Sequence, residues 1–97
     1  MTPAAKTPPA LAALRAQLEA LDAELVDVLA RRMELARRIG AEKRAASLPL
    51  QDPRREAQVV AAVARHAQRA GLPEESVRDI IWPVVAMCRR AQQDAAP

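Results

Sequence analysis

Large apolar residues recur at alternating steps of three and four along the first half of the chain. They stand at positions 11, 14, 18, 21, 25, 28, 35 and 39. An α-helix turns once every 3.6 residues, so this spacing places them on one stripe and predicts a helix from Leu11 to about Ala46. Gly40 weakens that helix, and the stretch from Ser47 to Pro53 ends it with two prolines.

Two shorter helices are predicted after the long one. Asp52 suits the N-cap of the second helix, Pro53 its first position and Gly71 its end. Its inner face is expected to hold Val59, Val60, Val63 and Ala67. The third helix opens at LPEES, where two acids favour the helix dipole, and it contains Pro83, which should kink it or shift its hydrogen bonds. Its apolar positions are Val77, Ile80, Ile81, Val84, Val85, Cys88 and Ala91.

The predicted fold is all-α, with one long and two shorter helices per chain. A first helix of roughly 35 residues would be about 52 Å long, whereas a compact domain of this size has a radius of gyration of about 13 Å. Because the two shorter helices cannot cover such a stripe, we expect another copy of the chain to cover it in a homodimer. Residues 1–9 hold three of the eight prolines, so we expect a flexible tail before a helical domain of residues 10–97.

Composition excludes several classes of function. Trp82 is the lone aromatic residue, which argues against modules that stack nucleic-acid bases on aromatic rings. Cys88 is the lone cysteine, which excludes an intrachain disulfide or a multi-cysteine zinc site. We find no apolar run long enough to cross a membrane and no segment of signal-peptide type, so we expect a cytoplasmic location. The net charge of +3 suits several anionic partners equally well.

Most cations of the long helix have an acid three or four residues away. Arg31, Arg37 and Arg38 have such neighbours, and these three are expected to face water. Arg32 occupies the next position of the apolar stripe, and its neighbours at those spacings are all apolar. An unpaired guanidinium is costly to bury, so Arg32 needs an anion from another helix or from a ligand. On spacing alone, a role in setting the register of a dimer explains the position of Arg32 equally well.

Several further polar residues each allow two interpretations, one functional and one structural. Lys43 also lacks a local partner and returns to nearly the same face as Arg32 about 16 Å away, although simple exposure near a helix end would account for it. Asp52, Arg55 and Glu56 read as capping residues when taken alone. Gln92 continues the third helix's stripe one turn after Cys88, which fits solvation of a helix end. Taken alone, Cys88 is most simply a small core residue.

Four pieces of the sequence, taken together, resemble the all-helical chorismate mutase family. No piece is specific by itself, but their order and spacing cover nearly the whole chain from Leu11 to Gln93. They are the LR of Leu14 and Arg15, the run LDAELVDVLARRMELARRIGAEK from Leu21 to Lys43, the DxxRE of Asp52, Arg55 and Glu56, and Gln92.

The resemblance implies an intertwined homodimer whose long first helices pair and whose sites are each built mostly from one chain. It implies that Arg32 binds one carboxylate of a small dianionic substrate and that Arg15 reaches into the partner's site to bind the other. Lys43 and Gln92 would donate hydrogen bonds to an ether oxygen. Asp52 and Glu56 would hold a ring hydroxyl, with Arg55 ordering that corner.

The implied reaction is the Claisen rearrangement of chorismate to prephenate, in aromatic amino acid biosynthesis from the shikimate pathway or in a secondary pathway. It requires no nucleophile, metal, cofactor or proton transfer. Catalysis would then consist of binding the folded diaxial conformer and stabilising the negative charge that grows on the ether oxygen.

Two features depart from the family pattern. Cys88 stands where a hydroxyl residue often contacts a substrate carboxylate, and a thiol is a weaker donor. Trp82 and Pro83 interrupt a helix that is usually regular, which bears on the placement of Gln92.

Several alternatives therefore stay open. Relatives of the family rearrange 4-amino-4-deoxychorismate or eliminate pyruvate from isochorismate, and some small ones gain activity only with a partner enzyme. A non-catalytic helical dimer that binds nucleic acid is a further alternative, although acids interleave with its basic residues.

Overall fold

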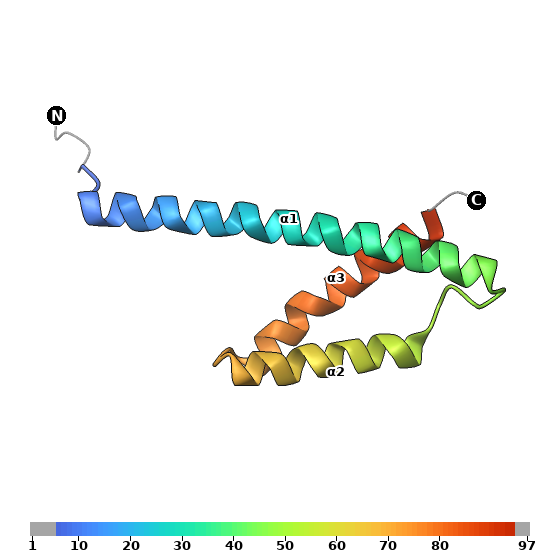
Figure 1. Ribbon diagram of the computed structural model, residues 1–97. Coiled ribbons are helices and arrows are strands. Elements are labelled where there is room, and N and C mark those ends of the chain that lie inside the picture. The colour runs from blue at the N-terminus through green and yellow to red at the C-terminus, as the bar shows by residue number, and fades with distance from the viewer. Residues whose placement is uncertain (1–5, 95–97) are drawn as a thin grey trace, which may run out of the picture. The chain divides into compact units, whose positions relative to one another are not determined.

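The computed structural model describes residues 6–94, and these form three helices and no strand (Figure 1). Helix α1 spans Pro9–Ala45, α2 spans Pro53–Arg69 and α3 spans Glu74–Asp94. The prediction of an all-α chain with one long and two shorter helices is confirmed. Of the predicted tail, residues 1–5 lie outside the described residues, and α1 already begins at Pro9.

The chain divides into two compact units, Met1–Ala30 and Arg31–Pro97, so α1 contributes to both. In the first unit, the described residues from Pro9 onward are one helical segment. Apart from the half-buried Leu29, its large apolar side chains are between 40% and 63% exposed, far more than core residues. Those of the predicted stripe are Leu11, Leu14, Leu18, Leu21, Leu25 and Val28.

The second unit has a small core in which short side chains bring the helices close together. Ala36 of α1 is buried against Cys88 and Ala91 of α3, and two partly buried side chains, Met33 and Val84, pack on this cluster. Helix α2 packs against α3 and buries Val60, Ala64 and Ala67. Among the apolar positions of α3, Ile80 is 65% exposed, because the buried side of the helix follows the line of Val85, Cys88 and Ala91.

The helix ends fix where the connecting segments begin. At the end of α2, Gly71 has a φ of 75° and Leu72 N–H donates to the Ala67 carbonyl at 2.9 Å, which is a Schellman cap. The end of α1 has the same pattern, with Ser47 at a φ of 55° and Leu48 N–H donating to the Lys43 carbonyl at 2.8 Å. Both caps satisfy carbonyl groups that the helix itself leaves without donors.

Helix α3 contains Pro83, as expected, and continues on both sides of it. Within residues 6–94, no helix combines the length and the apolarity that a membrane span requires. The cytoplasmic location stays a prediction.

Candidate active site

A cavity of about 460 Å³ lies among the three helices of the second unit. Seven of the eight site residues predicted from the sequence line it: Arg32, Lys43, Asp52, Arg55, Glu56, Cys88 and Gln92. Leu35, Ala36, Ile39, Val59 and Val85 supply its apolar walls. The eighth predicted residue, Arg15, lies in the first unit, where its side chain is exposed. The structure thus gathers residues from positions 32 to 92 around one volume.

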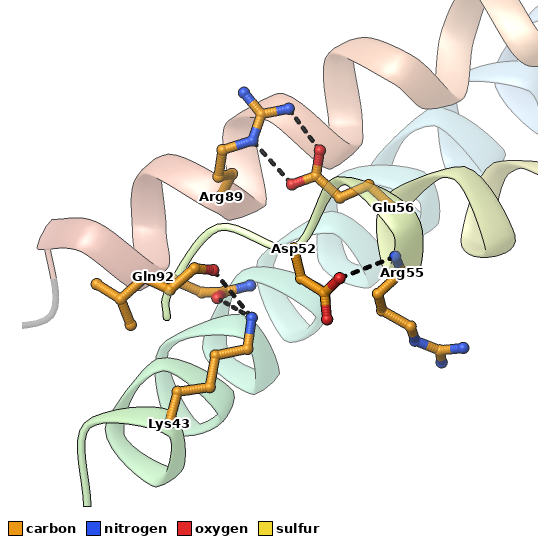
Figure 2. Close-up of polar contacts among 7 residues, drawn as sticks. Lys43, Asp52, Arg55, Glu56, Arg89 and Gln92 are labelled. Atoms are coloured by element: carbon orange, nitrogen blue, oxygen red, sulfur yellow. Dashed lines mark hydrogen bonds and ion pairs between the residues drawn. The ribbon is translucent and has the colours of Figure 1, made fainter. Parts of the chain in front are cut away.

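Lys43 and Gln92 both line this cavity, and their side chains meet (Figure 2). The Lys43 ammonium donates to Gln92 Oε1 at 2.9 Å and to the Leu50 carbonyl at 3.0 Å. Because an ammonium group has three N–H donors, one is left for a ligand. An ammonium cannot accept a hydrogen bond, so the amide oxygen of Gln92 must face Lys43, and its NH₂ group is left to donate elsewhere.

The backbone around Gln92 is held against the last turns of α1. Arg44 Nη2 donates to the Gln92 carbonyl at 2.7 Å and to the Gln93 carbonyl at 3.3 Å. Gly40 is buried, and a Cβ atom there would lie only 2.9 Å from the Gln92 carbonyl oxygen. The absence of a side chain at Gly40 therefore allows α3 to approach closely enough for Gln92 to reach Lys43.

The N-terminus of α2 forms the acidic corner of the cavity. Asp52 is its N-cap, and Asp52 Oδ1 accepts a hydrogen bond from the Arg55 backbone N–H at 3.1 Å (Figure 2). Pro53 follows as the first helical residue. The capping interpretation of Asp52 is thus confirmed. Asp52 and Arg55 also line the cavity, so a capping role and a ligand-binding role are compatible.

Glu56 is held by Arg89 of α3 in a two-point ion pair. Arg89 Nε donates to Oε2 at 2.8 Å and Arg89 Nη2 donates to Oε1 at 2.7 Å (Figure 2). The hydrogen bond from Arg89 is the main cause of a lowered pKa of Glu56, against the opposing effects of burial and of Asp52. Glu56 is therefore an acceptor with no proton of its own at neutral pH.

Arg32 is half-buried and lines the cavity on the side of α1. Among residues 6–94, no carboxylate forms an ion pair with it, whereas Arg37 and Arg38 both pair with Glu34 and are exposed. The prediction that Arg37 and Arg38 face water is confirmed. The guanidinium of Arg32 remains available to an anionic ligand.

The cavity therefore combines cationic and acidic side chains. Arg32, Lys43 and Arg55 contribute positive charge, and Asp52 and Glu56 contribute negative charge. Cys88 lines it with a buried thiol. No group of three or more His, Cys, Asp and Glu side chains in the described part of the chain is placed to hold a metal ion. The arrangement suits a small ligand that carries carboxylates together with a hydroxyl or amine.

Comparison with protein families gives a match over residues 14–93 to the family described as chorismate mutase type II. The chain belongs to this family. The resemblance inferred from the motifs is thereby confirmed, and a chorismate mutase of type II is an isomerase.

Similar proteins within this chorismate mutase group differ in size. The T-protein of Enterobacter agglomerans is 33% identical over 84 residues, which are 87% of this chain but only 22% of the T-protein. The 4-amino-4-deoxychorismate mutase of Streptomyces pristinaespiralis is 38% identical over 95% of this chain and 70% of its own length. The enzyme with the same description from Streptomyces venezuelae is 38% identical over 78% of this chain and 75% of its own length.

The chorismate mutase motifs did not reveal every residue that builds the site. Arg89 was missed because its partner Glu56 lies 33 residues away, and no spacing rule links the two helices. Arg44 was missed because a cation in the last turn of a helix is ordinary, so its contact with Gln92 had no signal in the sequence.

Proposed function

We propose that the cavity binds chorismate as a dianion and catalyses its rearrangement to prephenate. The observation that carries this proposal is the meeting of Lys43 and Gln92, from α1 and α3, in a pocket that also contains Arg32. Two donors for an ether oxygen and a free guanidinium for a carboxylate are the groups that this reaction needs. Family membership over residues 14–93 supports the same activity.

In this proposal, the enzyme accelerates the reaction without forming a covalent bond to the substrate. Arg32 binds one carboxylate and selects the folded conformer in which the two reacting carbons are close. As the carbon–oxygen bond breaks, negative charge grows on the ether oxygen. The free N–H of Lys43 and the NH₂ of Gln92 donate to that oxygen, and their fixed positions mean that no reorganisation is needed in the transition state.

The acidic corner would bind the substituent on carbon 4 of the substrate ring. Asp52 and Glu56 are hydrogen-bond acceptors, so either a hydroxyl or an ammonium can donate to them. Two relatives that match most of this chain are described as 4-amino-4-deoxychorismate mutases. We therefore retain the amino analogue as the second candidate substrate, and isochorismate with loss of pyruvate as a third.

A homodimer would complete the site. The stripe of exposed leucines in the first unit gives a second copy an apolar surface to cover, and such contiguous apolar surface typically marks an interface. Arg15 lies on the same segment, and we propose that it binds the second carboxylate in the partner's site.

The test is a product assay on the purified protein with chorismate, isochorismate and 4-amino-4-deoxychorismate, with the products separated by chromatography. Prephenate formed fastest from chorismate supports the main proposal. A higher kcat/KM for one of the analogues assigns the protein to that reaction instead. Turnover of none of the three by a folded dimer contradicts the proposed activity.

A further inference from the structure

Arg89 is a cation beside the acidic corner that the proposed mechanism does not use. Arg89 contacts both oxygens of Glu56, yet it does not line the main cavity. It lines a smaller cavity of about 270 Å³, together with Gln51, Asp52, Pro53 and Glu56. Glu56 and Asp52 thus border both cavities, and Arg89 reaches Glu56 from the second one.

Building on the proposed function, we propose that Arg89 is a positioning residue that fixes Glu56 and shifts the substrate preference of the pocket toward a ring hydroxyl and away from a ring ammonium. Arg89 itself touches no substrate in this proposal. It acts through the orientation and the charge of the one carboxylate that it binds.

The geometry accounts for the positioning. A guanidinium forms two parallel N–H···O bonds to a carboxylate, and this fork fixes the plane of the acid as well as its place. Here the two distances are 2.8 and 2.7 Å, and the Glu56 side chain is only 20% exposed. Glu56 is therefore held in one orientation before any ligand arrives.

The charges account for the preference. Asp52 and Glu56 would together present two negative charges to carbon 4 of the substrate, which favours an ammonium. The charged groups acting on Glu56 are Arg89 from α3, Lys43 from α1 and Asp52 at the cap of its own helix. Arg89 neutralises the charge of Glu56, so the corner attracts a cation less strongly. Its carboxylate oxygens can still accept a hydrogen bond from a hydroxyl.

The acid limb of the kcat/KM profile adds a signature that a merely structural role of Arg89 would not give. Arg89 is the main group that lowers the pKa of Glu56, whereas burial and Asp52 raise it. Without Arg89, Glu56 would take up a proton at a higher pH. A protonated carboxyl is a poorer acceptor, so the acid limb of kcat/KM would move to higher pH as well.

The experiment compares Arg89→Gln with Arg90→Gln, because Arg90 is the next residue on α3 and is exposed. For wild type and both variants, kcat/KM is measured across pH with chorismate and with 4-amino-4-deoxychorismate. We expect Arg89→Gln to lower the ratio of chorismate to amino-analogue activity about tenfold, the scale of losing one close charge interaction, and to move the acid limb upward. Arg90→Gln should change neither quantity.

Three further results decide the matter. Arg89→Lys keeps the charge without the fork and should recover the ratio in part, also where Arg89→Gln folds poorly. An unchanged ratio and acid limb in a folded Arg89→Gln overturn the proposal. If the wild type turns over neither substrate, the proposed function fails, but carboxyl ¹³C NMR still tests the positioning of Glu56 by Arg89. A pKa of Glu56 that is raised in Arg89→Gln and not in Arg90→Gln supports the positioning. Equal pKa values of Glu56 in these two variants overturn it.

Discussion

At the scale of single residues, the cations of α1 could be sorted from the sequence because an ion pair within one helix depends only on local spacing. Arg37 and Arg38 pair with Glu34, whereas Arg32 has no such partner and lines the cavity. Arg89 could not be anticipated in this way, because its contact with Glu56 joins two helices. Sequence spacing therefore predicts side-chain pairs within one helix but not pairs between two helices.

Cys88 leads to a prediction about substrate affinity. It is buried to 3% exposure and lines the cavity, and a hydroxyl is a stronger donor than a thiol. We expect Cys88→Ser to lower KM for chorismate about two- to tenfold with kcat little changed, as for one additional neutral hydrogen bond. Steady-state kinetics check this, with Cys88→Ala as the control. Equal KM values in the Ser and Ala variants would show that no donor at this position contacts the substrate.

At the scale of secondary-structure elements, the crossing of α1 and α3 determines whether the site forms. Gly40 has no side chain and faces the Gln92 backbone, Arg44 binds the Gln92 carbonyl, and Lys43 binds the Gln92 side chain. The sequence predicted the three helices and the Asp52 cap, because these follow from periodicity and local capping chemistry. It could not predict which helix Gly40 would face, since a glycine within a helix has several explanations.

Gly40→Ala tests this close approach. The added Cβ would lie 2.9 Å from the Gln92 carbonyl oxygen and 3.0 Å from its Cα, and neither atom can move without moving α3. We expect a net loss of about 1–2 kcal/mol in the free energy of unfolding, because overpacking outweighs the gain in helix propensity. Activity should fall further than stability does. Urea unfolding and kcat/KM measure the two effects.

Gly71→Ala provides the contrast. Gly71 has a φ of 75° with nothing within 4 Å of a Cβ, so alanine there should cost about 1 kcal/mol of stability through backbone strain alone. Its kcat/KM should equal that of the wild type. If the two glycine variants lost activity equally, the approach of α3 to Gly40 would have no special part in forming the site.

At the scale of the whole molecule, the second unit contains seven of the eight predicted site residues, and the first unit presents an exposed apolar stripe. The sequence predicted the stripe because it follows from spacing alone. The dimer and the crossing of Arg15 stay predictions. The dimer is expected from the uncovered stripe, and the crossing of Arg15 depends on that dimer.

Mixed dimers test the shared site. Arg15→Ala and Arg32→Ala are each expected to be nearly inactive as pure proteins. If Arg15 serves the partner's site, random exchange of subunits should restore about a quarter of the wild-type activity, because half of the dimers would then carry one intact site. No recovery after verified exchange would show that Arg15 acts within its own chain, whereas a fully active Arg15→Ala would show that it has no part in catalysis.

The proposed activity depends above all on the free guanidinium of Arg32, which would bind a substrate carboxylate in the cavity. The most direct measurement is kcat/KM for chorismate in Arg32→Lys, with Arg31→Lys as the matched control on the exposed side of the same helix. We expect Arg32→Lys to lose about a hundredfold in kcat/KM with the fold intact, because a lysine cannot provide the two-point contact. Arg31→Lys should match the wild type. Wild-type kcat/KM in both variants would show that Arg32 does not bind the substrate carboxylate.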